Sequence, residues 1–320
     1  MHQPRNGVQE RVSERAAFDR GKIALIGAPS SAGARMVGQE QAPRFLRRYG
    51  LVDRLRSIGL TVVDMGDLPE VRFSPDVLNP SQQNLTAVLE VLRGVSHAVD
   101  TAVANRAMPL VVGGDCTVTI GVAATLCRRF VEIGLLYFDA DADLNTPETT
   151  LTGILDGMVL AHIIGMGAPE LANLGLQRPL IDEDRIALFG YNEDGGGLDP
   201  VEIEFLRRTR MAKYPLDQIE RAVPQAAAHA VSSLQSRTEH FLVHFDVDVI
   251  DAVEFPAVDV PHRRGLSLSG TGEALSVMLQ CRGTVGLVVT EFNAGHANSG
   301  RLAEILNEMI CKALSASDDG

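Results

Sequence analysis

Apolar runs and mixed stretches alternate along most of the chain. Continuous apolar runs, typical of strands that are buried on both faces, occupy residues 22–27, 60–65, 108–112, 133–138, 185–189, 240–249 and 284–291. Between them, apolar residues recur at helical intervals over 42–58, 84–105, 117–130, 158–166, 200–208, 216–235, 269–280 and 301–314. Such alternation predicts an α/β domain with a mainly parallel central sheet covered by helices on both faces.

Aspartates follow two of the predicted strands at alternate positions. Asp139, Asp141 and Asp143 come after the run 133–138, and Asp246 and Asp248 end the run 240–249. In an extended backbone, alternate residues point to one face, so each cluster presents its carboxylates together. Three carboxylates within about 7 Å repel one another, and hard divalent cations prefer such oxygen clusters. The pattern therefore favours a metal site.

Simpler interpretations of these residues remain open. The first cluster is also compatible with a solvated acidic loop or a calcium-binding loop, although the latter needs a glutamate where Thr150 stands. Cys116, after Gly113-Gly114-Asp115, can be a small buried hydrophobe, and Glu291 can be half of a salt bridge. If these strand ends converge, however, they supply six candidate ligands: Cys116, Asp139, Asp141, Asp143, Asp246 and Asp248. Six ligands suffice for two metal ions, and a pair of ions about 3.5–4 Å apart can activate a water molecule.

Composition narrows the class of protein. The 320 residues carry a net charge of −12, which argues against a nucleic-acid or anionic-membrane surface and suits a cationic substrate. No apolar run has the length of a membrane span, and residues 1–20 lack the apolar core of a signal peptide. The four cysteines lack paired spacing, which indicates free thiols in a reducing cytoplasm. We expect one domain over residues 21–316 after a flexible arm at 1–20.

The strand-end motifs resemble those of the ureohydrolase family, which includes arginases and agmatinases. GGDC (113–116) resembles the family's GGDH, DADADLNTPETT (139–150) resembles DAHxDxNTPxTT, and HFDVDVID (244–251) resembles SFDVDxxDP. TEFN (290–293) resembles the late glutamate motif, and the likeness spans about 22–314. It implies a three-layer α/β/α fold, two Mn²⁺ ions and hydrolysis of a linear C–N bond in a small cationic guanidino or amidine compound, with a metal-bridging hydroxide as nucleophile. Trimers or hexamers are frequent in this family.

The resemblance also implies individual roles. Asp139 and Asp246 match the carboxylates that bridge both ions, Cys116 and Asp143 complete one ion, and Asp141 and Asp248 complete the other. Asp143 would also orient the nucleophile. Asn145, Thr150 and Thr152 match the segment that contacts an amino-acid carboxylate in arginases, and Glu291 matches the acid that pairs with the guanidinium.

Three positions depart from the family pattern. Cys116 and Asp141 replace metal-binding histidines, and Asp156 in GILDG replaces a proton-shuttle histidine. All six ligands are then anionic, which raises the pKa of a bound water. A thiolate shifts the preference from manganese toward zinc or iron, with nickel a further alternative. Asp156 is the candidate for the missing proton transfer, if acidic neighbours raise its pKa.

These departures leave two functional hypotheses. The first is a hydrolase with a changed substrate, such as the hydroxyguanidine of hydroxyarginine. The second is a catalytically silent binding or regulatory protein. The segment that grips the substrate's amino group in arginases has no clear counterpart in GYNEDGGGLDP (190–200), where Glu193 and Asp194 are candidate substitutes. We interpret His162 and His244 as core residues or neighbours of the site, and His296 as a weaker candidate for reaching it.

Overall fold

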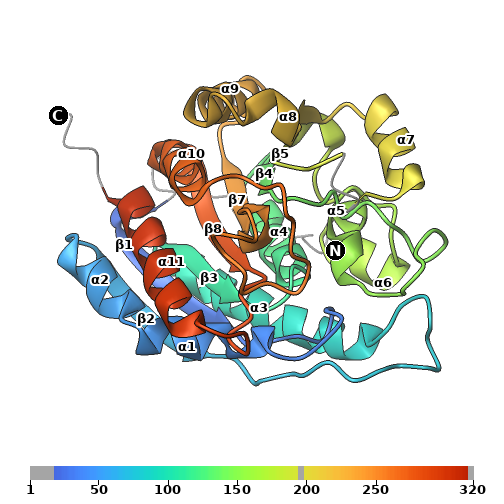
Figure 1. The fold of residues 1–320 in the computed structure, drawn as a ribbon, viewed down its shortest axis with the longest axis horizontal. Coiled ribbons are helices and arrows are strands. Elements are labelled where there is room, and N and C mark those ends of the chain that lie inside the picture. The colour runs from blue at the N-terminus through green and yellow to red at the C-terminus, as the bar shows by residue number, and fades with distance from the viewer. Residues whose placement is uncertain (1–17, 194–197, 316–320) are drawn as a thin grey trace, which may run out of the picture.

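The computed structural model describes residues 18–193 and 198–315 and contains one central sheet. Eight strands, all parallel, lie in the order β2-β1-β3-β8-β7-β4-β5-β6 (Figure 1). The strands are β1 (Asp19–Ala28), β2 (Thr61–Asp67), β3 (Ala107–Gly113), β4 (Gly134–Phe138), β5 (Ile186–Phe189), β6 (Ala212–Tyr214), β7 (Phe241–Asp246) and β8 (Thr284–Thr290). The predicted parallel sheet is confirmed.

Helices cover the sheet on both faces. Those of the described residues are α1 (Ala42–Arg48), α2 (Leu51–Ser57), α3 (Leu85–Ala104), α4 (Val118–Arg129), α5 (Val159–Ile163), α6 (Pro169–Ala172), α7 (Pro200–Arg208), α8 (Leu216–Ile219), α9 (Val223–Gln235), α10 (Leu268–Gln280) and α11 (Ser299–Leu314). One apolar core joins the sheet to α1, α2, α9, α10 and α11, and the other joins it to α3, α4 and α5. The fold is therefore the expected three-layer α/β/α arrangement.

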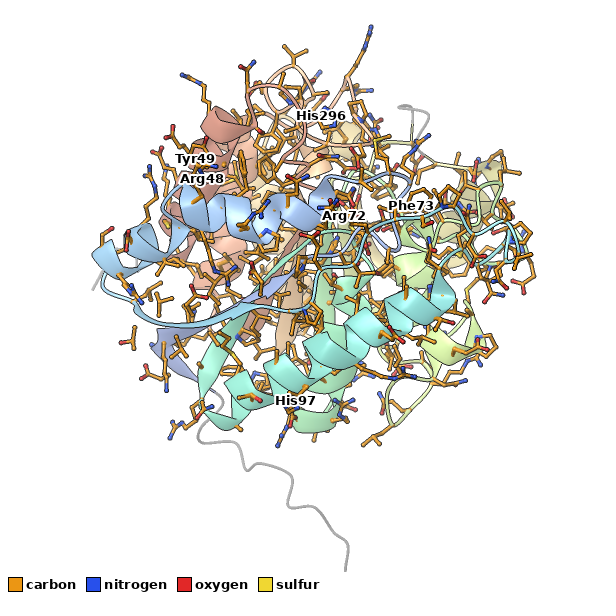
Figure 2. The ribbon with its side chains drawn as sticks, turned by 90° about the horizontal axis from the view of Figure 1, so that it is seen from below. Arg48, Tyr49, Arg72, Phe73, His97 and His296 are labelled. Atoms are coloured by element: carbon orange, nitrogen blue, oxygen red, sulfur yellow. The ribbon has the colours of Figure 1, made fainter. Side chains whose placement is uncertain are left out.

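The two cores explain why the strands are apolar without interruption. In β1, Ile23 and Leu25 enter one core while Ala24 and Ile26 enter the other, because successive strand residues point to opposite faces. The outer helix α3 buries only one side, whereas α4 is buried all round from Val118 to Leu126. In α3, Val88, Leu92, Val95 and Val99 are buried at helical spacing, whereas His97 is exposed on the outer surface (Figure 2).

Several element boundaries differ from those predicted. The stretch 42–58 forms two helices rather than one, since Gly50 has a left-handed backbone with φ of 90° between α1 and α2. The stretch 216–235 likewise divides into α8 and α9, and β6 is a short edge strand that the apolar pattern does not predict. The strand predicted over 240–249 ends at Asp246, where a 3₁₀ turn (Val247–Val249) begins.

The four strands that carry the suspected motifs lie side by side. β3, β8, β7 and β4 form the middle of the sheet, so the residues that follow them meet at one edge. Within the described residues, no helix has both the length and the apolar character needed to cross a bilayer.

Candidate metal centre and substrate cavity

A cavity of about 250 Å³ opens at the carboxyl ends of the central strands. Its lining includes the predicted metal ligands, Asp156, Glu291 and the three residues expected to contact an amino-acid carboxylate: Cys116, Asp139, Asp141, Asp143, Asn145, Thr150, Thr152, Asp156, Asp246, Asp248 and Glu291. Gln39, Asp199 and Asp259 also line it, and the sequence gives no sign of these three. The structure thus brings the predicted residues together, while their individual roles stay predictions.

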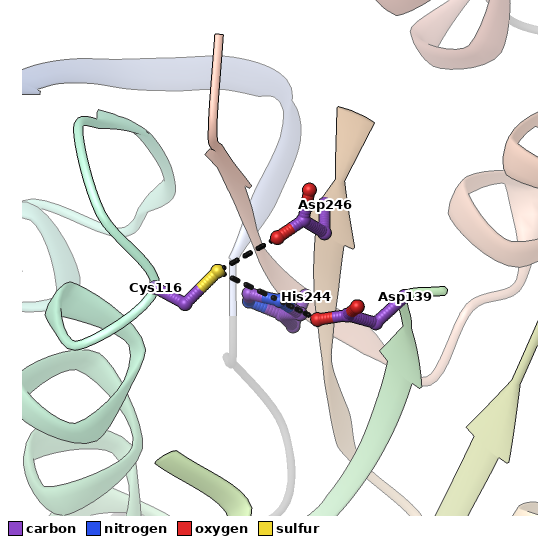
Figure 3. A group of neighbouring side chains, drawn as sticks. All are labelled: Cys116, Asp139, His244 and Asp246. Atoms are coloured by element: carbon purple, nitrogen blue, oxygen red, sulfur yellow. Dashed lines mark hydrogen bonds and ion pairs between the residues drawn. The ribbon is translucent and has the colours of Figure 1, made fainter. Parts of the chain in front are cut away.

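The inner end of the site is built around Cys116 (Figure 3). Its Sγ lies 2.8 Å from Oδ2 of Asp246, and Nε2 of His244 lies 3.7 Å from Sγ and 3.5 Å from Oδ2 of Asp139. Cys116 is only 2% exposed and His244 is fully buried. We define Cys116, Asp139, His244 and Asp246 as the inner group, whose potential ligand atoms all lie within 4.8 Å of one another.

A tight turn after β3 positions Cys116. A Cβ on Gly114 would stand 1.6 Å from the carbonyl oxygen of Ser30, so only glycine allows this approach between the ends of β3 and β1. The buried carboxylate of Asp115 accepts hydrogen bonds from the Ser30 hydroxyl and the Gly33 amide, at 3.0 and 3.1 Å. The turn is therefore fixed on both sides.

An aromatic ring and a hydroxyl group hold the side chain of His244 in place. It is the register partner of Tyr137 in the neighbouring strand, and the two rings stack with centroids 4.0 Å apart. Nδ1 of His244 lies 2.8 Å from Oγ1 of Thr119, and the Tyr137 hydroxyl donates to Asp143. Burial lowers the pKa of His244 to about 4, so its ring is neutral at neutral pH. His244 is therefore a buried neighbour of the carboxylates, which is one of the two interpretations that the sequence allowed (core residue or neighbour of the site).

A second group lies at the outer end and includes a histidine to which the sequence pattern assigns no role. Nε2 of His262 is 3.3 Å from Oδ2 of Asp141 and 3.9 Å from Oδ2 of Asp248. We define Asp141, Asp248 and His262 as the outer group, whose potential ligand atoms again lie within 4.8 Å of one another. His262 is 5% exposed and belongs to the loop 251–266, where no periodicity predicts a buried side chain.

The carboxylates crowd one another in a buried environment. Burial, followed by the charge of Asp139, raises the pKa of Asp246 to about 7. Burial and neighbouring carboxylates likewise raise the pKa values of Asp139, Asp143 and Asp248 well above the ordinary range. Oδ1 of Asp141 and Oδ1 of Asp248 are buried without a hydrogen-bond partner among the described residues. This set of oxygen, nitrogen and sulfur donors fits divalent cations, which would neutralise it.

Two of the cavity carboxylates stand on an unfavourable backbone. Asp143 has φ of 49° and Glu291 has φ of 67°, in the left-handed region that non-glycine residues avoid at a cost of about 1 kcal/mol each. The backbone amide of Glu291 donates to the carbonyl of Gly114 at 2.9 Å, and the carbonyl of Asp143 accepts from Ala161 at 3.1 Å. The surrounding backbone thus holds both carboxylates toward the cavity.

Glu291 and Asp156 lie next to each other beside Cys116, and potential ligand atoms of the three residues all lie within 4.8 Å of one another. The carboxylate of Asp156 accepts from the backbone amide of Cys116 at 2.6 Å, and the carboxylate of Glu291 accepts from the Gln39 side chain. Burial and then neighbouring carboxylates raise the pKa values of Asp156 and Glu291 well above their ordinary range. Oε1 of Glu291 has no partner among the described residues, so it can accept from a bound cationic group.

Polar residues form the outer rim. The Asn145 amide donates to Asp199 at 3.0 Å, and the Thr150 and Thr152 hydroxyls lie 3.4 Å apart. Glu193, which the sequence offers as a contact for an amino group, is exposed and does not line this cavity. Asp199 lines it instead, held where α7 begins by a reciprocal capping box with Glu202. Asp194 lies outside the described residues.

His162 and His296 belong to neither the inner nor the outer group. His162 is fully buried in α5, where its Nδ1 is 2.6 Å from the carbonyl of Met158, so it is a core residue. Nε2 of His296 pairs with Asp259 at 3.2 Å, and its side chain is 40% exposed. His296 therefore reaches the cavity only through Asp259, which lines it.

Comparison with known proteins gives one consistent result. The model of the arginase family matches residues 21–315. The chain is 28% identical to the arginase of Bacillus caldovelox over 263 residues, which cover 81% of this chain and 87% of that relative. It is also 28% identical to the arginase of Bacillus subtilis over 297 residues, which cover 91% of this chain and 98% of that relative. The solved structure of the Bacillus caldovelox arginase aligns with a TM-score of 0.84 at 25% identity, covering 93% of this chain and 99% of that one. The chain belongs to the arginase family.

Proposed function

We propose that this protein is a dinuclear metal-dependent amidinohydrolase that cleaves the linear C–N bond of a guanidino compound. The observation that carries the proposal is the convergence of the inner and outer groups in one cavity with Glu291. Membership in a family whose named relatives are arginases supports the reaction class. Two divalent ions held by these carboxylates would supply Lewis acidity and lower the pKa of the attacking water.

Each side chain has a role consistent with its place. Asp143, which accepts from the Tyr137 hydroxyl, would orient the attacking water. Glu291, with one buried oxygen unpaired, would bind the cationic guanidinium through charge-assisted hydrogen bonds. Asn145, Thr150 and Thr152 at the rim would contact the amino-acid end of the substrate.

Asp156 would transfer a proton to the leaving amine. It lines the cavity beside Glu291, where it accepts the Cys116 amide, and it occupies the position of the family's proton-shuttle histidine. A carboxyl is a weaker substitute for imidazole when the leaving group is strongly basic. We therefore propose a less basic guanidine, such as the hydroxyguanidine of hydroxyarginine, as the substrate.

The test is a panel of arginine, agmatine, guanidinobutyrate and hydroxyarginine, with urea or hydroxyurea measured as product. We expect turnover of hydroxyarginine and at least tenfold less of arginine, as an order of magnitude for one impaired proton transfer. Asp156→Ala should slow hydroxyarginine, and Asp156→His should not by itself create an arginase. Fast arginine hydrolysis would refute the changed substrate class. Full metal loading without turnover of any of the four would favour the silent binding protein.

We further propose Mn²⁺ as the leading candidate metal, with zinc, iron and nickel as alternatives because of Cys116. The four cysteines are free thiols, which supports a cytoplasmic location. A trimer or hexamer is the proposed assembly, which light scattering coupled to gel filtration would test. Protein that stays free of metal after reconstitution with each of the four metals would end the enzyme hypothesis.

A further inference from the structure

We infer that His262 is a metal ligand of the outer group, and that it supplies from a different loop the imidazole that Asp141 replaces. The inference rests on the proposed dinuclear centre and deepens it. Asp141 comes from the loop after β4, Asp248 from the 3₁₀ turn after β7, and His262 from the loop that leads to α10. Three separate segments therefore meet at one point.

The distances suit coordination of one ion. Ligand atoms bound at about 2.1 Å around a tetrahedral or octahedral ion lie about 3.0–3.4 Å apart. Nε2 of His262 stands 3.3 Å from Asp141 and 3.9 Å from Asp248, so small side-chain rotations would admit an ion between the three groups. The second oxygen of each carboxylate, Oδ1, is buried and lacks a partner among the described residues. Buried carboxylate oxygens normally have a partner. Here they lie unpaired beside an imidazole, and a bound cation would be the partner that they lack.

The loop holds the imidazole in this position. The backbone carbonyl of His262 accepts from Ala252 at 2.9 Å, and Leu266 and Val249 are joined by a hydrogen bond of 2.8 Å. Ile250 and Leu266 form a parallel bridge. The loop is thus anchored at the end of β7, immediately beside Asp248. Because these backbone contacts do not involve the imidazole, replacing the His262 side chain should leave the loop in place.

A neutral nitrogen donor changes the chemistry of the outer ion. With Asp141 in place of histidine, Asp139, Asp141, Asp246 and Asp248 alone would form an all-oxygen site, which suits manganese, magnesium or calcium. His262 restores a nitrogen without adding negative charge. The outer ion would then be a transition metal such as manganese, iron, cobalt or zinc, rather than calcium or magnesium.

The test compares metal binding of the full chain and three variants by calorimetry and elemental analysis, with manganese and cobalt as probes. The variants are His262→Ala, the double variant Asp141→His with His262→Ala, and the control His240→Ala, a half-buried histidine at the opposite end of β7. We expect two ions in the wild type and at least about a tenfold loss of affinity for one of them in His262→Ala. The double variant should regain that affinity, because it returns the imidazole to position 141. The control should match the wild type.

The outcomes separate this inference from the proposed function. Two ions of unchanged affinity in His262→Ala would overturn the histidine ligand and leave the dinuclear hydrolase standing. Loss of affinity that Asp141→His does not rescue would mean that His262 acts only on local structure, and circular dichroism and thermal melting would show that change. A wild type that binds neither manganese nor cobalt would overturn both. In the cobalt protein, loss of the imidazole should also change the visible ligand-field spectrum, a measurement independent of turnover.

Discussion

The two ends of the candidate metal centre, the inner group and the outer group, are constructed differently. The inner group stands on strand ends: Cys116 follows β3, Asp139 follows β4, and His244 and Asp246 belong to β7, each no more than 2% exposed. The outer group stands on loops and a 3₁₀ turn, and Asp141 is only half-buried. Strand pairing and the tight turn after β3 hold the inner ligands in place, whereas the outer ligands depend on loops. We therefore expect the inner ion to bind first and more tightly.

The largest effect should come from the residues shared by both ends. Asp139→Ala or Asp246→Ala should abolish binding at both positions, because each is the predicted bridge, whereas Asp248→Ala should affect only the outer ion. Elemental analysis after reconstitution distinguishes these cases. Glu291→Ala is the matched control, since it should keep both ions and lose substrate. A full metal complement in Asp246→Ala would show that the bridge is wrongly assigned.

A second prediction concerns the Cys116 thiol, which belongs to the inner group and has no counterpart in the outer group. Cobalt-loaded wild type should show a near-ultraviolet sulfur-to-metal charge-transfer band, which Cys116→Ser abolishes. Cys116→His should shift the preference from zinc toward manganese, since imidazole is a harder donor than thiolate. Competition between the two metals, measured by calorimetry, gives the shift. If the band persists in Cys116→Ser, it arises from another cysteine and the inner ligand set needs revision.

The smallest effect should come from the support of the outer end. Glu202, 3% exposed, accepts from the amides of Leu144 and Asp199 at 2.9 Å each, and so ties α7 to the loop that carries Asp141 and Asp143. Glu202→Gln loses one of these acceptors and should reduce the free energy of unfolding by about 1–2 kcal/mol. Thermal melting of wild type and variant, metal-loaded, measures the difference.

That difference should depend on pH. Burial raises the pKa of Glu202 to about 7 from its ordinary 4.5. A carboxyl whose pKa is higher in the folded than in the unfolded protein stabilises the folded state most at pH values below its ordinary pKa. For Glu202 this contribution is lost as the pH rises to about 7. The gap between wild type and Glu202→Gln should therefore narrow as the pH rises from about 4.5 to about 7. A gap that widens would mean that Glu202 is ionised in the folded protein throughout.

The features that the sequence could predict also differ between the inner and the outer end. Asp139 and Asp246 were predictable as neighbours because each ends an apolar run, and ends of parallel strands meet. The stacking of Tyr137 on His244 was not predictable, because it depends on the pairing of β4 with β7, segments far apart in the chain. His262, inside a loop, and Asp199, at the start of α7, escaped prediction because their positions depend on contacts with distant segments. The break at Gly50 was hidden by apolar spacing that continues across it.

The left-handed backbones of Asp143 and Glu291 have a consequence for how this chain tolerates substitution. Glycine at either position would relieve about 1 kcal/mol of backbone strain, and each would remove a buried carboxylate from a crowded cluster. A library selected only for resistance to heat, without metal, would therefore accumulate glycine or asparagine at these two positions. Every such survivor would be a more stable protein that lacks one of the proposed metal or substrate contacts. Thermostability screens of this scaffold thus need a simultaneous screen for bound metal, or they will enrich inactive proteins.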